Sequence, residues 1–455
     1  TQSPSSAASD VYKRQADVFG VTMPVVKHSY LVRNVNDLPR VMNEAFHLAT
    51  SGRPGPVLVD LPKDVVSAEC EADFTDKFHL PGYAPPARGL TEDLEKAAEL
   101  ISFSKKPLLY VGAGAVIAQA SKQVIGLAEK LQAPVTTTLL GKGAFPETHP
   151  LSVGMLGMHG TAYANKTVVD CDLIMAIGAR WDDRITGKVS EFCRDATKIH
   201  IDVDPAEFGK IIDPDVSIAG DAKLVLEDLI PLVSKLDSQP WLKQIEKWKK
   251  KYPLKFPKRG GLRAQQVLKE LDRLTDSKAI ISTDVGQHQM WTAQFCKTNE
   301  ERKWLSSGGA GTMGYGLPSA IGAQLGCPDE LVVAVVGDGG FQMTMPELAT
   351  AAIHKLPIKI LIINNRYLGM VRQWQQLFFD NRESGVDMMG NPDFVKIGEA
   401  YGIKGFHLRR TGDITKVLKR ALDYNDGPCI IEAEVVKGDN VCLLYTSPSP
   451  RDPSI

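Results

Sequence analysis

Short apolar runs alternate along the chain with longer stretches in which apolar residues recur at helical spacing. The runs that predict buried strands are 57–62, 107–112, 133–138, 172–178, 198–204, 279–284, 331–337, 358–365 and 428–436. Helical spacing is clear over 38–50 and over 91–102, where Thr91 is the expected N-terminal cap. Strands that alternate with helices indicate parallel sheets. The pattern therefore predicts an α/β fold of successive doubly wound parallel-sheet domains.

Linkers rich in proline and glycine divide the chain into three blocks. The expected blocks are 16–68, 90–237 and 262–441, joined by linkers at 69–89 and 238–261. The second linker contains the basic run WKKKYPLKFPKRGG, which we interpret as a solvated connector. The two ends, 1–15 and 442–455, are polar and resemble translated adapter sequence, so we expect them to be non-native tails on a fragment. A natural disordered tail is the alternative.

Charge and cysteine content exclude several classes of protein. Lys and Arg number 53 against 54 Asp and Glu, so no basic field is available for nucleic acid or for a membrane surface. The longest apolar runs, such as 331–336, are far shorter than the ~20 residues that span a bilayer. Seven cysteines without a C-x-x-C pair argue against a disulfide framework and a zinc site. We expect a cytoplasmic protein.

The strongest chemical signal lies at 331–371. A buried strand runs into Gly337-Asp338-Gly339-Gly340, and the next strand runs into Asn364-Asn365. The intervening helix is expected to start near Pro346, with Thr344 and Glu347 at capping-box spacing. Because the carboxyl ends of neighbouring parallel strands share one edge, Asp338 and Asn365 should meet around Mg²⁺ beside a diphosphate. Two unrelated polar turns are the alternative, and the absence of a Walker sequence disfavours a P-loop NTPase.

This signal extends into a family resemblance. GDGGF at 337–341 followed by NN at 364–365 resembles the thiamine-diphosphate (ThDP) signature of 2-keto-acid enzymes. The segments 52–65, 157–165, 177–187, 307–324 and 364–375 all resemble the acetohydroxyacid synthase catalytic subunits, and the resemblance covers about 16–441. It implies decarboxylation of pyruvate on ThDP and carboligation to a second 2-keto-acid, pyruvate or 2-ketobutyrate. This is the first common step of branched-chain amino-acid biosynthesis.

The resemblance also implies partners and cofactors. It implies Mg²⁺, ThDP and a largely structural FAD, in a homodimer or tetramer with active sites at the subunit interface and a regulatory small subunit. The implied Mg²⁺ ligands are Asp338, Asn365 and the backbone carbonyl of Tyr367, and Met313 is implied to support the V shape of ThDP. The implied ThDP contacts are Gly286, Gln287, His288, Gly311, Met313, Gly337, Asp338, Gly339, Gly340, Asn365, Tyr367, Leu368, Gly369 and Met370.

The middle block resembles the FAD domain of that family. Gly112-Ala113-Gly114 follows a strand, but the third glycine of G-x-G-x-x-G is missing, so the motif alone is weak. The acidic side chains of Asp202 and Asp221 are implied to face ribose or adenine. The implied FAD contacts are Arg53, Gly112, Ala113, Gly114, Met158, His159, Gly178, Ala179, Arg180, Asp182, Arg184, Asp202 and Asp221.

Arg184 and Trp374 are the residues expected to select the second substrate. By the resemblance, Arg184 pairs with its carboxylate, for which a planar guanidinium is suited, and Trp374 favours 2-ketobutyrate. The alternatives are an ion pair of Arg184 with Asp182 or Asp183, and plain core burial of Trp374. The family's catalytic glutamate is expected upstream of residue 16, and no glutamate here, Glu44 included, lies in its motif. We therefore expect this polypeptide by itself to be inactive or nearly so.

Three other functions remain open at this level. A related ThDP enzyme, such as a pyruvate oxidase or an oxalyl-CoA decarboxylase, would lack the combination of Arg184 and Trp374. An NAD(P) dehydrogenase would require the glycine fingerprint that the middle block lacks. A non-catalytic cofactor-binding or scaffold protein is the third alternative.

Overall fold

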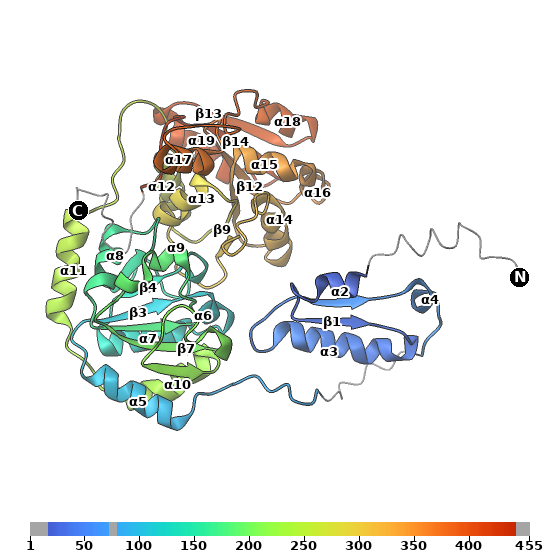
Figure 1. Ribbon diagram of the computed structural model, residues 1–455. Helices are drawn as coiled ribbons and strands as arrows, with labels where there is room; N and C mark the ends of the chain where they lie inside the picture. Colours follow the sequence, from blue (N-terminus) through green and yellow to red (C-terminus); the bar gives the residue numbers. More distant parts are fainter. Residues whose placement is uncertain (1–16, 72–79, 443–455) are drawn as a thin grey trace, which may run out of the picture. The chain divides into compact units, whose positions relative to one another are not determined.

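The computed structural model describes residues 17–71 and 80–442, and the chain divides into two compact units with the boundary between Ala87 and Arg88 (Figure 1). The predicted tail 1–15, most of 442–455 and part of the linker 69–89 lie outside the described residues. Within the described ranges, no helix is long and apolar enough to cross a membrane.

The first unit is a short parallel sheet packed against one long helix. Its elements are α2 (Val18–Thr22), β1 (His28–Leu31), η1 (Val35–Asp37), α3 (Leu38–Thr50), β2 (Val57–Asp60) and α4 (Lys63–Val66). The strands pair in parallel, His28 opposite Val57, and Val32, Val41 and Val65 form the core. The helix predicted over 38–50 is therefore confirmed.

The second unit contains two six-stranded sheets in which all strands are parallel. The first sheet contains β3 (Pro107–Val111), β4 (Val135–Thr137), β5 (Ser152–Met155), β6 (Leu173–Ile177), β7 (Thr197–Asp202) and β8 (Val216–Ala219), in the order β5-β4-β3-β6-β7-β8. The second contains β9 (Ile280–Thr283), β10 (Trp304–Ser306), β11 (Val332–Gly337), β12 (Lys359–Asn364), β13 (Lys404–Leu408) and β14 (Cys429–Glu434), in the order β10-β9-β11-β12-β14-β13. The predicted α/β class with parallel sheets is confirmed.

Helices cover both faces of each sheet, and each face has its own apolar core (Figure 1). Around the first sheet lie α5 (Thr91–Ser102), α6 (Ala113–Ile117), α7 (Ser121–Leu131), η2 (Leu139–Gly141), α8 (Ala162–Asp170), α9 (Asp183–Thr186), η3 (Val189–Glu191), η4 (Pro205–Glu207), α10 (Ala222–Leu232) and α11 (Gln239–Lys251). Around the second lie α12 (Ala264–Thr275), α13 (Gln287–Phe295), α14 (Gly316–Gly326), α15 (Asp338–Thr344), η5 (Met345–Glu347), α16 (Leu348–Ile353), α17 (Gly369–Phe378), α18 (Phe394–Ala400), η6 (Thr411–Asp413) and α19 (Ile414–Leu422).

Three local predictions were wrong. The predicted connector 238–261 begins with helix α11, which buries Trp241 and Ile245 in the core beneath the first sheet. The cap of α5 is Leu90, and Thr91 is already helical without a side-chain capping bond. The helix after β11 begins at Asp338 instead of near Pro346, and the Thr344 hydroxyl donates to the carbonyl of Gly314 instead of capping a helix. In this case the helix starts immediately at the strand end.

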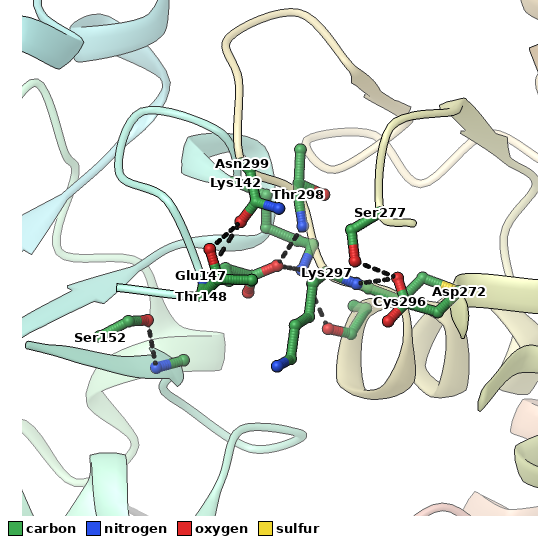
Figure 2. Close-up of polar contacts among 12 residues, drawn as sticks. Lys142, Glu147, Thr148, Ser152, Asp272, Ser277, Cys296, Lys297, Thr298 and Asn299 are labelled. Atoms are coloured by element: carbon green, nitrogen blue, oxygen red, sulfur yellow. Dashed lines mark hydrogen bonds and ion pairs between the residues drawn. The ribbon is translucent and has the colours of Figure 1, made fainter. Parts of the chain in front are cut away.

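A buried ion pair in the loop after η2 makes hydrogen bonds to the end of helix α13 and to the residues that follow it (Figure 2). The Lys142 ammonium contacts the Glu147 carboxylate at 2.5 Å and donates to the carbonyls of Ala293 and Cys296, near the last turn of α13. Glu147 in turn accepts a bond from the backbone N–H of Thr298 at 2.7 Å. The side chain of Lys142 has no exposed surface, and that of Glu147 is 9% exposed. Two segments more than 140 residues apart in sequence are thereby fixed together.

Candidate functional site

The first candidate site lies at the carboxyl edge of the second sheet. The strand order changes direction between β9 and β11, which is where ligands bind in open parallel sheets. β11 and β12 are direct neighbours, with Gly337 opposite Ile363, so Asp338 and the Asn364-Asn365 pair follow adjacent strands. Asp338 is 2% exposed and Asn365 is 6% exposed. The structure therefore brings the predicted metal-ligand pair to one buried edge.

Burial of Asp338 raises the pKa of its carboxyl to about 6, although hydrogen bonds from Asn391 and from backbone groups oppose this shift. The Asn391 side-chain amide donates to Asp338 Oδ2 at 2.7 Å. A buried carboxylate is costly unless a positive charge compensates it. Oxygen ligands in a compact, mostly dry position suit Mg²⁺, so the residues present fit this cation.

Asn365 lies in contact with α13 and α17. Its side-chain nitrogen donates to Gln287 Oε1 at 3.2 Å, and its Oδ1 accepts from the backbone N–H of Tyr367 at 3.1 Å. A Cβ atom at Gly369 would lie 2.0 Å from Gln287 Oε1, so a larger residue there would displace the Gln287 side-chain amide. The predicted ThDP residues Gln287, Asn365, Tyr367 and Gly369 thus form one contiguous group.

His288 supplies a buried nitrogen beside the glycine turn. Its ring lies against Gly286 and Gly337, and a Cβ at Gly337 would approach the ring to 2.8 Å. Nε2 is buried without a partner among the described residues, and burial lowers the pKa of His288 to about 3. This nitrogen lies next to a helix start and glycine backbone, and it can donate to a phosphate oxygen when Nε2 carries the ring proton. This observation supports a diphosphate at this position.

Apolar side chains meet over Gly339. A Cβ at Gly339 would lie 2.7 Å from Leu368 Cδ2, 3.2 Å from Met388 Sδ and 3.6 Å from Met313 Cε. The predicted residues Met313 and Leu368 therefore share one surface, with Met388 as an additional member. Flexible methionines fill an irregular apolar contact well, as expected beneath a bulky ring.

Two functional candidates were missed from the sequence. Asp284 is 1% exposed at the end of β9, where its carboxylate accepts from the N–H groups of Val285 and Gly314 and lies against Gly340. The signal in the sequence was that Asp284, an acidic residue, directly follows a buried strand. Asn391 lies in an irregular segment, where no pattern of the sequence indicates its contact with Asp338.

The second candidate site lies at the carboxyl edge of the first sheet. Its strand order is that of a dinucleotide-binding fold, with the switch point between β3 and β6. Gly112-Ala113-Gly114 follows β3, and Gly178 follows β6. The N–H of Gly114 donates to the carbonyl of Gly178 at 2.9 Å, and a Cβ at Gly112 would lie 2.3 Å from that oxygen. These glycines allow close packing of the two turns, and the topology fits a dinucleotide such as FAD.

Several other residues predicted to contact FAD make hydrogen bonds in the loops at the carboxyl edge of the first sheet. The N–H of Met158 donates to the carbonyl of Arg184, and Asp182 accepts from the N–H of Arg184. Asp202 accepts from the N–H of Asp204. Asp221 caps α10 through the N–H groups of Lys223 and Leu224, so a helix cap accounts for this residue without a ligand.

The remaining predicted FAD residues differ in burial and in position. Ala179 is buried, whereas Arg180 is exposed and pairs with Asp182 at 3.3 Å. Burial lowers the pKa of His159 to about 4. Arg53 belongs to the first unit and is exposed there.

Arg184 and Trp374 lie together although they come from different sheets. The Arg184 guanidinium carbon is 5.0 Å from the centre of the Trp374 ring. The competing ion pair with Asp183 spans 3.9 Å between side chains that are 59% and 82% exposed, which makes it weak. Trp374 is only partly buried and packs edge-on against Phe378. A cation beside an aromatic face can bind a short 2-keto-acid, with the carboxylate on the arginine.

Two family models match the chain. Residues 284–433 match the C-terminal TPP-binding domain of thiamine pyrophosphate enzymes, and residues 94–229 match the central domain of these enzymes. The acetolactate synthase large subunit of Cyanidium caldarium is 46% identical over 452 residues, which cover 96% of this chain and 76% of the relative. That of Porphyra purpurea is 46% identical, covering 96% and 75%. The acetolactate synthase of Mycobacterium bovis is 44% identical, covering 92% and 70%.

Proposed function

The chain belongs to the acetolactate synthase large-subunit family of thiamine-diphosphate enzymes, and from this premise we propose the reaction, the ligands and the residue roles that follow. The proposed reaction is decarboxylation of pyruvate and transfer of the remaining two-carbon unit to a second pyruvate or to 2-ketobutyrate. The observation that carries the proposal is the buried group of Asp338, Asn365 and His288 at the switch point of the second sheet.

Asp338, Asn365 and the carbonyl of Tyr367 would hold Mg²⁺, which would supply positive charge for the diphosphate. Bound ThDP supplies a carbon nucleophile and an electron sink for decarboxylation. The residues of this chain bind the cofactor and orient it. The start of α15 and the Gly337–Gly340 backbone accept the diphosphate, His288 offers a side-chain nitrogen, and Met313 with Leu368 supports the ring.

The second keto-acid would bind beside the Arg184–Trp374 pair. The guanidinium holds the carboxylate in a fixed plane, and the indole face supplies apolar surface for the acceptor side chain. FAD would bind at the β3–β6 switch point of the first sheet, beside Gly112 and Gly178. Because the relatives are named large subunits, we also infer assembly with a smaller regulatory subunit. A homodimer or tetramer of the large subunit is part of the same proposal.

Removal of the proposed metal ligand tests the cofactor assignment. Asp338→Ala should abolish Mg²⁺-dependent ThDP binding, because the cation loses its only charged protein ligand in the proposed set. FAD binding should persist, since its proposed contacts belong to the first sheet. Calorimetric titration with ThDP, with and without Mg²⁺, and the flavin absorbance of the purified protein provide the two measurements. Loss of both cofactors from a folded variant would contradict the assignment of separate sites.

A further inference from the structure

Asn391 lies between α17 and α18 and contacts the proposed metal ligand directly. Its amide nitrogen donates to Asp338 Oδ2 at 2.7 Å and lies 3.3 Å from Asn364 Oδ1. Asn391 is 53 residues away from Asp338 in sequence. The contact therefore depends on the tertiary fold alone.

Neighbouring side chains fix the orientation of this amide. Gln342 donates to Asn391 Oδ1 at 3.0 Å, so the oxygen of the amide faces Gln342 and the nitrogen must face Asp338. On the other side, Asn364 donates its own nitrogen to Glu432 Oε1 at 2.8 Å, which leaves Asn364 Oδ1 as the acceptor toward Asn391. Glu432 is 3% exposed, so this outer contact is well shielded from water.

Backbone and capping hydrogen bonds also hold the segment around Asn391. The backbone N–H of Asn391 donates to the carbonyl of Met388 at 3.1 Å. Two residues later, Asp393 caps α18 through the N–H of Lys396 at 3.1 Å. Backbone and capping bonds thus hold the segment, and the side-chain amide is directed at Asp338.

We propose that Asn391 is a positioning residue of the divalent-cation site, holding one oxygen of the Asp338 carboxylate so that the other remains available to the cation. The inference rests on the proposed function and deepens it. Groups that orient a metal ligand in this way usually change metal affinity by about 10- to 100-fold when they are removed. Asn391 acts through Asp338.

The test measures Mg²⁺ affinity separately from cofactor affinity. Asn391→Ala removes the donor, and Asn391→Leu keeps the approximate size of the side chain but offers no donor and adds no charge. ThDP binding is followed by calorimetry across a series of Mg²⁺ concentrations. Both variants should need about 10- to 100-fold more Mg²⁺ for half-maximal binding, and at saturating Mg²⁺ their ThDP affinity should approach that of the wild type. Direct titration with Mn²⁺, followed by electron paramagnetic resonance, should show the same loss without any turnover.

A nearby substitution serves as the matched control. Met389 lies two residues away with 72% of its surface exposed, so Met389→Ala should keep the wild-type Mg²⁺ dependence. Unchanged Mg²⁺ dependence in Asn391→Leu would overturn the inference, as would an equal loss of ThDP affinity at all Mg²⁺ concentrations. A wild-type chain that binds ThDP without any Mg²⁺ dependence would overturn the proposed function itself, and this inference with it.

Discussion

The indole of Trp374 and the guanidinium of Arg184 form the most specific pair of side chains in the proposed acceptor site. They are supplied by α17 and α9, and their contact at 5.0 Å needs both sheets to be in place. An additional methylene in an apolar pocket is worth only about 1–3 kcal/mol. A preference for 2-ketobutyrate over pyruvate therefore requires a large apolar surface, which the Trp374 ring can supply.

In a full-length enzyme that includes the catalytic glutamate, Trp374→Leu should keep pyruvate decarboxylation and lose the preference for 2-ketobutyrate by roughly 10-fold or more, the scale of one methylene contact. Arg184→Lys should weaken both acceptors alike, because the ammonium keeps the charge and loses the bidentate geometry. The measurement is a competition between the two keto-acids in the active enzyme, with both acetohydroxyacid products quantified. A parental product ratio in the Trp374 variant would show that the acceptor binds elsewhere.

Single residues were predictable where a rule connects sequence to a place in the fold. Asp338 and Asn365 follow buried strands, and parallel topology alone sends such residues to one edge. Their adjacency in the structure agrees with that rule. Asn391 follows no strand and belongs to no periodic pattern, so its contact with Asp338 exists only after the chain has folded. The roles of these residues in binding remain predictions.

Among the elements, the turns after β3 and β6 depend on glycine. Gly178 has a φ of +56°, and a Cβ there would lie 2.6 Å from the Cα of Gly114. Gly126, inside α7 (Ser121–Leu131), has open space around the corresponding position. Substitution of these two glycines by alanine should therefore change the free energy of unfolding in opposite directions.

Gly178→Ala should lower the free energy of unfolding by at least about 1–2 kcal/mol, the cost of a left-handed conformation in a non-glycine residue, and the backbone clash adds to this. Gly126→Ala should raise it by about 0.5–1 kcal/mol, because alanine loses less entropy in a helix. Urea unfolding of both variants gives the values. Equal stability of Gly178→Ala and the wild type would mean that the two turns separate easily.

The predicted bounds of helices were wrong where the composition of a segment and the spacing of its apolar residues indicate different structures. The run of lysines near residue 250 favoured a connector, yet Trp241, Ile245 and Trp248 recur at helical spacing and place α11 against the core. Glycines at 339 and 340 favoured a loop, yet the backbone continues as α15 because Phe341 is fully buried in the core below the sheet. Tertiary burial outweighed local preference in both cases.

At the scale of the whole molecule, the Lys142–Glu147 pair connects the first sheet to the site in the second. Lys142 satisfies carbonyls near the carboxyl end of α13, and the amino end of the same helix supplies Gln287 and His288 to the proposed diphosphate site. At that amino end, Gln287 donates to Gln373 Oε1 and to the carbonyl of Asp439. Side-chain hydrogen bonds therefore hold both ends of α13.

Lys142→Leu should cost about 3–5 kcal/mol of stability, because Glu147 would remain buried without its partner charge. The double variant Lys142→Leu with Glu147→Gln should recover part of this loss, since no uncompensated charge remains. Thermal or urea unfolding provides the comparison. Lys278→Leu is the control: its pair with Asp276 is 75% and 80% exposed, so its effect should stay within about 0.5 kcal/mol. Similar small effects at both positions would contradict the role of the buried pair.

The all-parallel strand order of the second sheet also affects the rates of folding and unfolding. β11 pairs with β9, about 50 residues earlier, and with β12, and Asp338 can meet Asn365 only once β11 and β12 have paired. Non-local pairing slows folding, and we expect the complete binding edge, which also needs β9, to form late. A ligand that needs this edge cannot assist the early steps. Such a ligand can only slow unfolding. Binding at this edge should therefore lengthen the lifetime of the native state and leave the folding rate unchanged.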